Sequence, residues 1–218
     1  MSRLLPLLLA LALGGCASGP AKPKLPYNAW FVGLGTPDYM EVWVESVDVI
    51  DQRGLAFQRV AGGVASTGRP ADNKGKPRGW PKRVGRGAGK NLPGIDLPEM
   101  IFVRWQSLVE PQTYNVRIPI PQWVRDEMRK PYRAYCHFDG AWIDDQYRHD
   151  ITIGLAPGGI AKAWVGGPCL DSIEIGRFVG KVSEIGPDLG RTNGRYALPL
   201  APESKAYIEK FGVPYDSW

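Results

Sequence analysis

Residues 100–120, MIFVRWQSLVEPQTYNVRIPI, decide the fold of this chain. In each half, apolar side chains recur at every second position: Ile101, Val103 and Trp105, then Tyr114, Val116, Ile118 and Ile120. A period of two places these side chains on one face of a β-strand. Glu110-Pro111-Gln112 between the halves predicts a tight turn, because Pro suits its second position. The stretch therefore predicts an antiparallel hairpin with one buried face.

The preceding segment predicts a second pair of strands. Residues 39–50, YMEVWVESVDVI, alternate, but the valines before Glu45 occupy even positions and those after Ser46 occupy odd positions. A β-bulge at this point would produce the change, because one extra residue shifts the parity of the side chains that follow. Gly54 permits a turn, after which residues 55–60 can return as the partner strand.

The rest of the chain continues the β pattern. Further strands are predicted at residues 132–138, 147–155, 160–165 and 172–185, and short helices at 121–130 and 202–211. The 27 Gly and 20 Pro residues favour short strands and turns over long helices. About eight strands, joined mostly as hairpins, predict a mainly β chain. We expect an antiparallel β-sandwich or barrel-like domain with two short helices.

Residues 61–94 interrupt the strands and predict a long basic loop. Residues 69–90 hold eight Lys or Arg against one acid, a charge of +7. Loops of this length are functional or mobile. Three interpretations are open: a solvated mobile insertion, a surface for anionic lipid headgroups, or a docking surface for an acidic protein. The candidate partner- or lipid-binding residues are Lys76, Arg78, Trp80, Lys82, Arg83 and Arg86, with Trp80 as an interface anchor.

The first fifteen residues are typical of an export signal. Arg3 precedes an apolar run at residues 4–13, which as a helix would rise only about 15 Å, half of a bilayer core. Leu13-Gly14-Gly15-Cys16 then resembles the lipobox of bacterial lipoproteins, in which the Cys thiol accepts a diacylglycerol. We expect cleavage before Cys16 and lipid attachment to it. The alternative is an ordinary signal peptide with an incidental Cys.

A lipid on Cys16 would place the mature chain in the cell envelope. Ala17 and Ser18 follow it, and without Asp at this place the general lipoprotein pattern predicts the outer membrane, facing the periplasm. Residues 16–26 predict a flexible tether, and residues 27–218 a single periplasmic domain. Loss of Arg3 with the signal changes the net charge from +5 to +4, so the mature residues outside 69–90 carry about −3.

Two further cysteines, Cys136 and Cys169, remain in the mature chain. In an oxidising periplasm they are candidates for a disulfide, and the other interpretation is a pair of buried free thiols. In the chain-entropy model, a disulfide closing this loop would stabilise the fold by roughly 3–4 kcal/mol.

The mature chain contains no familiar catalytic signature. It has two His, His137 and His149, and neither a Gly-x-Ser-x-Gly elbow nor a phosphate-binding Gly loop. Cys136 and His137 are strand neighbours whose side chains would point to opposite faces. The two His and the nearby aspartates (Asp139, Asp144, Asp145 and Asp150) match no zinc or calcium spacing. We expect no enzyme activity, no cofactor and no metal, and, for an exported chain, no nucleic-acid partner.

Several short motifs resemble a bacterial family of lipoproteins of unknown function. They are Leu97-Pro98, Val103-x-Trp105-x-Ser107-Leu108-x-Glu110, Tyr114, Gly154-Leu155-Ala156-Pro157-Gly158-Gly159, Trp164, Phe211-Gly212-Val213-Pro214 and Trp218, together with the lipobox. Members of that family are often encoded beside type VI secretion phospholipase effectors. The resemblance implies an immunity lipoprotein whose partner is a periplasmic lipase effector, and it implies no catalytic residues. The alternative is a structural or assembly lipoprotein that binds lipid or an envelope component through its basic loop.

Overall fold

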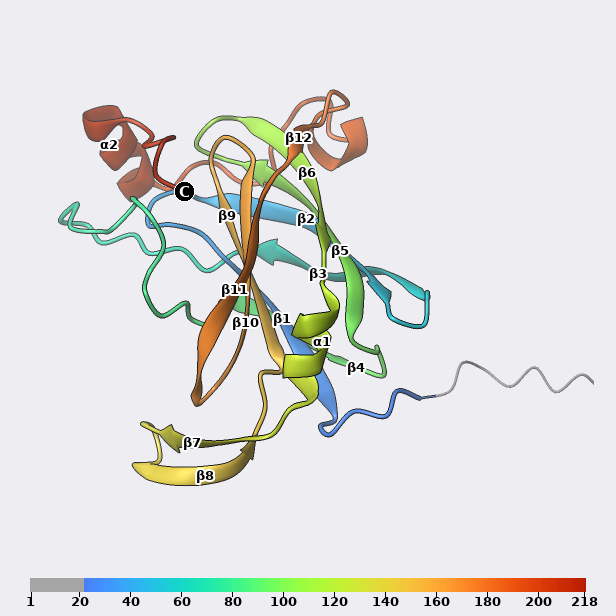
Figure 1. The fold of residues 1–218 in the computed structure, drawn as a ribbon. Helices are drawn as coiled ribbons and strands as arrows, with labels where there is room; N and C mark the ends of the chain where they lie inside the picture. Colours follow the sequence, from blue (N-terminus) through green and yellow to red (C-terminus); the bar gives the residue numbers. More distant parts are fainter. Residues whose placement is uncertain (1–21) are drawn as a thin grey trace, which may run out of the picture.

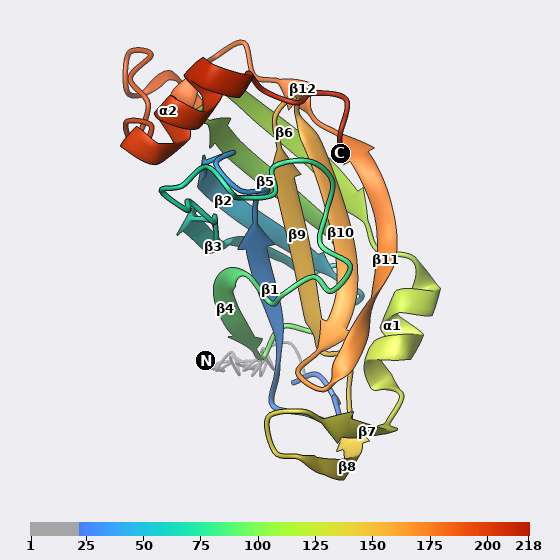
Figure 2. The ribbon, with the colours of Figure 1, turned by 90° about the vertical axis from the view of Figure 1, so that its left-hand side faces the viewer.

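The computed structural model describes residues 22–218. The predicted signal segment, Cys16 and the tether residues before Lys22 lie outside this range. Two five-stranded sheets pack face to face without closing into a barrel, which confirms a mainly β, sandwich-like fold (Figures 1 and 2). Within the described range, no helix combines the length and the apolar character needed to cross a membrane.

The first sheet has the strand order β11-β10-β9-β1-β4. Its strands are β1 (Ala29–Gly35), β4 (Ala88–Pro93), β9 (Asp150–Ala156), β10 (Ile160–Gly167) and β11 (Leu170–Val179). β1 pairs with β9 in parallel, whereas the other neighbours are antiparallel. The spacing of apolar residues in the sequence does not predict β1. Five of its seven residues are buried in succession, so it lacks the alternation that marks a half-exposed strand.

The second sheet has the order β12-β6-β5-β2-β3. Its strands are β2 (Val42–Asp51), β3 (Ala56–Val64), β5 (Pro98–Ser107), β6 (Gln112–Pro119) and β12 (Lys181–Val182). The predicted hairpin is confirmed as β5 and β6. The predicted bulge is also confirmed. Val44 pairs with Trp105 and Ser46 with Arg104, so Glu45 is the extra residue.

The remaining elements lie outside the two main sheets. They are the two-stranded hairpin of β7 (Tyr132–Cys136) and β8 (Ala141–Gln146), the helices α1 (Gln122–Arg129) and α2 (Pro202–Phe211), and a short 3-10 segment, η1 (Pro187–Gly190). Both predicted helices are confirmed. α1 buries Val124 and Met128 against the core, as their spacing of four predicts.

The main core lies between the sheets, where Ile151, Ile153 and Leu155 of β9 meet side chains of β2, β5 and β6. A smaller cluster lies toward α2. In it, Tyr39 stacks on Tyr207 with a ring separation of 4.3 Å, and Trp218 is buried.

The predicted loop at residues 61–94 is partly wrong. β3 extends to Val64 and β4 begins at Ala88, so strands occupy both ends of the range. The glycines in these strands weaken the sequence pattern that would predict a strand. They also permit the close approach of the neighbouring backbone. A side chain at Gly89 would place its Cβ 1.8 Å from the carbonyl oxygen of Val32 on the neighbouring strand. Residues 65–87 remain irregular and run across the outer face of the first sheet (Figure 2). We call them the covering segment.

The two ends of the sandwich differ. The first described residues and the β7–β8 hairpin lie at one end, and α2 and the C-terminus lie at the other (Figures 1 and 2). Tyr27, just before β1, contacts the rings of Tyr147 and His149 at 5.6 and 5.3 Å. The chain therefore enters the sandwich beside the base of the hairpin.

Candidate functional site

Three basic residues of the covering segment form ion pairs with carboxylates elsewhere in the chain, and only that of Arg86 reaches a buried partner. Arg86 forms an ion pair of 3.1 Å with the buried carboxylate of Asp150, and its guanidinium lies 3.7 Å from the ring centre of Phe31. Arg83 pairs with Asp171, and Arg78 pairs with Asp216. These three candidates for partner or lipid binding thus have intramolecular partners.

The indole of Trp80, the candidate interface anchor, is partly buried and packs against the smaller core cluster. It lies edge-on to Trp164 at 5.2 Å, and it covers Gly154, where an added Cβ would approach the indole to 2.4 Å. Because Gly154 has no side chain, the Trp80 indole can pack directly on β9 at this position. Thr152 on the same strand donates hydrogen bonds to the carbonyls of Gly85 and Arg86.

Lys76 and Lys82 are exposed candidates without a charged partner among the described residues, whereas the exposed side chains of Arg78 and Arg83 each pair with an aspartate. Within residues 22–218 no ion pair or side-chain hydrogen bond involves the ammonium group of either lysine. Solvent and salt screen exposed charges of this kind, so they form a weak electrostatic surface. Of the six candidates, Trp80 and Arg86 are engaged in packing on the first sheet, and the other four side chains remain exposed.

Cys136 and Cys169 are joined by a disulfide, with their Cα atoms 4.8 Å apart. Cys136 ends β7, and Cys169 lies in the turn between β10 and β11. The bond therefore ties the outer end of the β7–β8 hairpin to the first sheet. Asp139 lies near the two sulfur atoms, within 4.8 Å, but these sulfurs are bonded to each other.

The hairpin carries a group of exposed aromatic side chains that we call the aromatic tip: Tyr135, Phe138 and Trp142. Phe138 lies in the turn and is 92% exposed, Trp142 is 62% exposed and Tyr135 is 41% exposed. Tyr135 and Trp142 face each other across the two strands, with ring centres 5.8 Å apart. Single exposed apolar residues are ordinary on a protein surface, but three on one small hairpin indicate a binding surface.

The base of the hairpin is fixed by polar contacts to α1. Glu127 accepts hydrogen bonds from the Tyr132 hydroxyl at 2.5 Å and from Arg148 at 3.3 Å, and the Arg148 guanidinium also lies over the Tyr132 ring. Tyr27 packs nearby. Burial raises the pKa of Tyr27 above its usual range, so its hydroxyl stays neutral.

The His and Asp residues of this region are spread over both ends of the hairpin. His137 contacts Tyr135 near the tip, whereas His149 lies 2.9 Å from Asp150 at the base. Asp144 pairs with Arg133 on the strands. His137 and His149, the two His of the mature chain, therefore lie at different ends of the hairpin.

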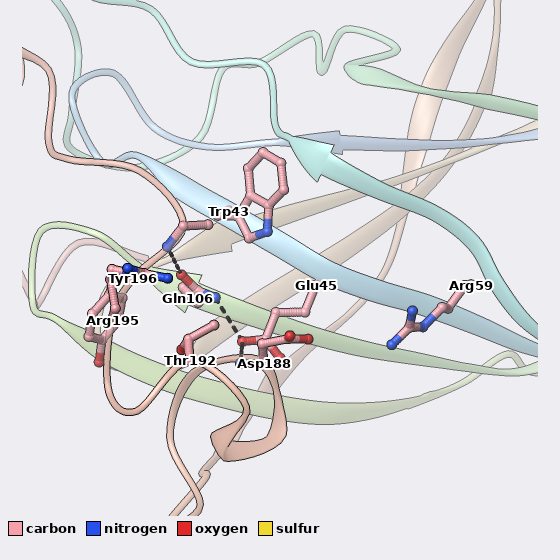
Figure 3. Close-up of a pocket in the computed structure, with 9 residues that line it drawn as sticks. Trp43, Glu45, Arg59, Gln106, Asp188, Thr192, Arg195 and Tyr196 are labelled. Atoms are coloured by element: carbon pink, nitrogen blue, oxygen red, sulfur yellow. Dashed lines mark hydrogen bonds between the residues drawn. The ribbon is translucent and has the colours of Figure 1, made fainter.

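A second candidate region is a polar hollow on the outer face of the second sheet (Figure 3). Its volume is about 420 Å³, and a smaller hollow of about 240 Å³ adjoins it. The bulge at Glu45 organises this region. The Glu45 carboxylate accepts hydrogen bonds from Arg104, Gln106 and the backbone N–H of Asp188.

The far wall of this hollow is the irregular segment between β12 and α2. Gln106 accepts a hydrogen bond of 2.8 Å from the N–H of Ala197, which fixes the other end of the wall. Asp188 and Leu189 adopt left-handed backbone conformations. The charges of Glu45 and Asp188 are each matched by a neighbouring arginine. These contacts indicate a structural role for the hollow, since they hold the segment between β12 and α2 against the second sheet. The aromatic tip is the stronger candidate for a binding surface.

The comparisons with known proteins give one match. The family model described as Protein of unknown function (DUF2931) matches residues 17–216. Neither the curated proteins nor the solved structures include a match to this chain.

Proposed function

Since the chain belongs to the family described as Protein of unknown function (DUF2931), we propose that it is a membrane-anchored periplasmic lipoprotein that binds another protein. In this proposal it is an immunity protein that neutralises a lipase effector delivered by type VI secretion. It has no reaction of its own, and its lipid holds it at the membrane that the lipase would attack.

The observation that carries the proposal is the aromatic tip. Phe138 and Trp142 are mostly exposed, and the disulfide and Glu127 hold the hairpin that presents them. Aromatic side chains of this kind dominate the binding energy of protein interfaces. A rigid surface loses less conformational entropy on association, so its contacts contribute more to affinity.

The predicted anchor agrees with this arrangement. The tether at residues 16–26 leads into Tyr27, which contacts the base of the hairpin. Eleven residues extend at most roughly 40 Å. A lipid on Cys16 would therefore keep the aromatic tip close to the bilayer surface, where a phospholipase must work.

The anchor is tested by metabolic labelling of the full chain with radioactive palmitate. The wild type is expected to take up the label and to sediment with outer-membrane fractions, and a Cys16→Ser variant is expected to remain unlabelled. An unlabelled wild type would contradict the lipoprotein proposal.

The immunity role is tested with a phospholipase effector of type VI secretion from the same bacterium. Cells that lack the chain are expected to lose viability when this lipase is directed to their periplasm, and the wild-type chain is expected to restore it. Failure of the wild-type chain both to bind the lipase and to protect would exclude this function.

A second candidate is a structural or assembly lipoprotein that binds lipid through residues 69–90. The exposed Lys76 and Lys82 favour it, but Arg78, Arg83 and Arg86 already have intramolecular partners. A Lys76→Gln, Lys82→Gln variant that leaves salt-dependent binding to anionic vesicles unchanged would argue against this candidate.

A further inference from the structure

We propose that the aromatic tip is a preformed plug that enters an apolar, cation-rimmed cavity of its protein partner. This inference rests on the proposed function, in which the partner is the lipase effector. The plug would occupy the entrance through which the lipase receives its apolar substrate.

The first argument is the exposure of the tip. Among residues 22–218, no other large hydrophobic side chain is as exposed as Phe138, at 92%. It stands in the four-residue turn that joins β7 to β8, so it projects from the outermost point of the hairpin. A side chain in this place can enter a concave site on the partner without a clash between the sandwich and the surface of the partner.

The second argument is rigidity. Cys136, two residues before Phe138, is bonded to Cys169 of the first sheet. Arg133 lies over the Trp142 ring at 5.8 Å and pairs with Asp144 on the same face. The disulfide restricts the turn before any partner binds, and Arg133 adds an exposed contact to the indole, so fewer conformations are lost on association.

The third argument is charge, and it selects a protein partner over a lipid bilayer. Residues 132–147 carry one cation, Arg133, and three exposed carboxylates, those of Asp139, Asp144 and Asp145. A tip with this excess of negative charge is repelled by anionic headgroups, and deep insertion would remove water from its carboxylates. A cavity whose rim carries Lys or Arg complements the same tip.

The fourth argument is position. The hairpin lies at the end of the sandwich where the chain enters from the tether (Figures 1 and 2). A phospholipase turns its entrance toward the bilayer, so a plug held at the bilayer surface meets that entrance directly. The aromatic residues at the opposite end, such as Phe211 on α2, would not.

The experiment measures the affinity of the full chain, purified in a non-ionic detergent, for a purified phospholipase effector of type VI secretion from the same bacterium. Phe138→Ser and Trp142→Ser should each weaken binding on the order of 30-fold or more, as expected for the central residues of an interface. The matched control is Phe211→Ser, which removes a ring that is 54% exposed at the other end and should change affinity less than about twofold. The Asp139→Lys, Asp145→Lys variant should also bind more weakly, and salt should weaken the wild type.

The outcomes separate the plug from the proposed function. If the wild type binds and inhibits the lipase but the Phe138 and Trp142 variants bind equally well, the plug is overturned and the function stands. If the wild type neither binds nor inhibits, both fail. Proteoliposomes of phosphatidylethanolamine and phosphatidylglycerol with brominated acyl chains test the bilayer. Quenching that disappears in Trp142→Phe, in the absence of lipase, would show that the hairpin sits in the bilayer and would overturn the plug.

Discussion

At the residue scale, Arg86 combines a charge with a packing role. It neutralises Asp150, which is buried under the covering segment, and it covers one face of Phe31. Without Arg86, the His149 ring, 2.9 Å away, would be the remaining close side-chain partner of the Asp150 carboxylate among the described residues. Arg86, although it belongs to a basic segment, thus packs at the edge of the core.

Arg86→Ala is therefore expected to lower the free energy of unfolding by about 1–3 kcal/mol, the cost of leaving a buried acceptor poorly paired. Urea unfolding followed by tryptophan fluorescence measures this change. Arg83→Ala is the matched control, because Arg83 and Asp171 are both more than 70% exposed and such a pair contributes little. Equal losses in the two variants would contradict the role assigned to Arg86.

The environment of Asp51 leads to a second prediction at the residue scale, which concerns the dependence of stability on pH. Burial opposes ionisation of Asp51 and is the largest single influence. The hydrogen bonds from the Arg53 side chain and from the backbone N–H groups of Arg53, Asp96 and Leu55 together outweigh it, so the pKa of Asp51 lies below its ordinary 3.8. The charged form therefore stabilises the fold above the unfolded pKa, and this contribution disappears as pH falls through the folded pKa.

The difference in unfolding free energy between wild type and Asp51→Asn should accordingly be largest near neutral pH and should shrink below pH 3.8. Urea unfolding at a series of pH values from neutral to acidic measures it. A difference that grows as the solution is acidified has the wrong sign for this account.

At the element scale, the covering segment depends on one position of β9 that has no side chain. Gly154 of β9 leaves room for Trp80, and the indole holds residues 65–87 over the sheet. β9 is consequently buried along its whole length, with Ile151, Ile153 and Leu155 in the core and the intervening residues under the segment. The covering segment thus buries the outer face of β9, as a third layer of secondary structure would otherwise do.

Gly154→Ala is expected to displace Trp80 and to destabilise the protein by about 1–3 kcal/mol, the usual cost of overpacking. Limited trypsin digestion should then cut faster after Lys82 and Arg83, because the segment is released. Gly85→Ala is the control, since an added Cβ there meets no atom within 4 Å. Unchanged digestion in Gly154→Ala would mean that Trp80 does not hold the segment.

At the scale of the whole molecule, the disulfide joins the hairpin to the sandwich across 33 residues of chain. In the chain-entropy model, a bond that closes a loop of this length stabilises the fold by about 3–4 kcal/mol. The Cys136→Ser, Cys169→Ser variant should lose this amount in urea unfolding. A reductant should bring the wild type to the same stability and leave the variant unchanged, and an equal effect of the reductant on both proteins would contradict the prediction.

The sequence alone determined the elements whose signals are local. The β5–β6 hairpin, the bulge at Glu45 and both helices follow from the spacing of apolar residues and from the position of Pro and Gly, which act over a few residues. The mainly β composition of the sandwich follows from the sum of such segments. The sequence also contains Leu13-Gly14-Gly15-Cys16, which resembles a lipobox and lies outside the described residues.

Only the tertiary structure decided which distant segments meet. The parallel pairing of β1 with β9 joins segments separated by more than 100 residues, and burial on both faces removes the alternation that would predict β1. Residue type does not reveal which face of the molecule a ring occupies. Trp80 packs over Gly154 of β9 and is partly buried, whereas Phe138 lies in a hairpin turn and is exposed to solvent.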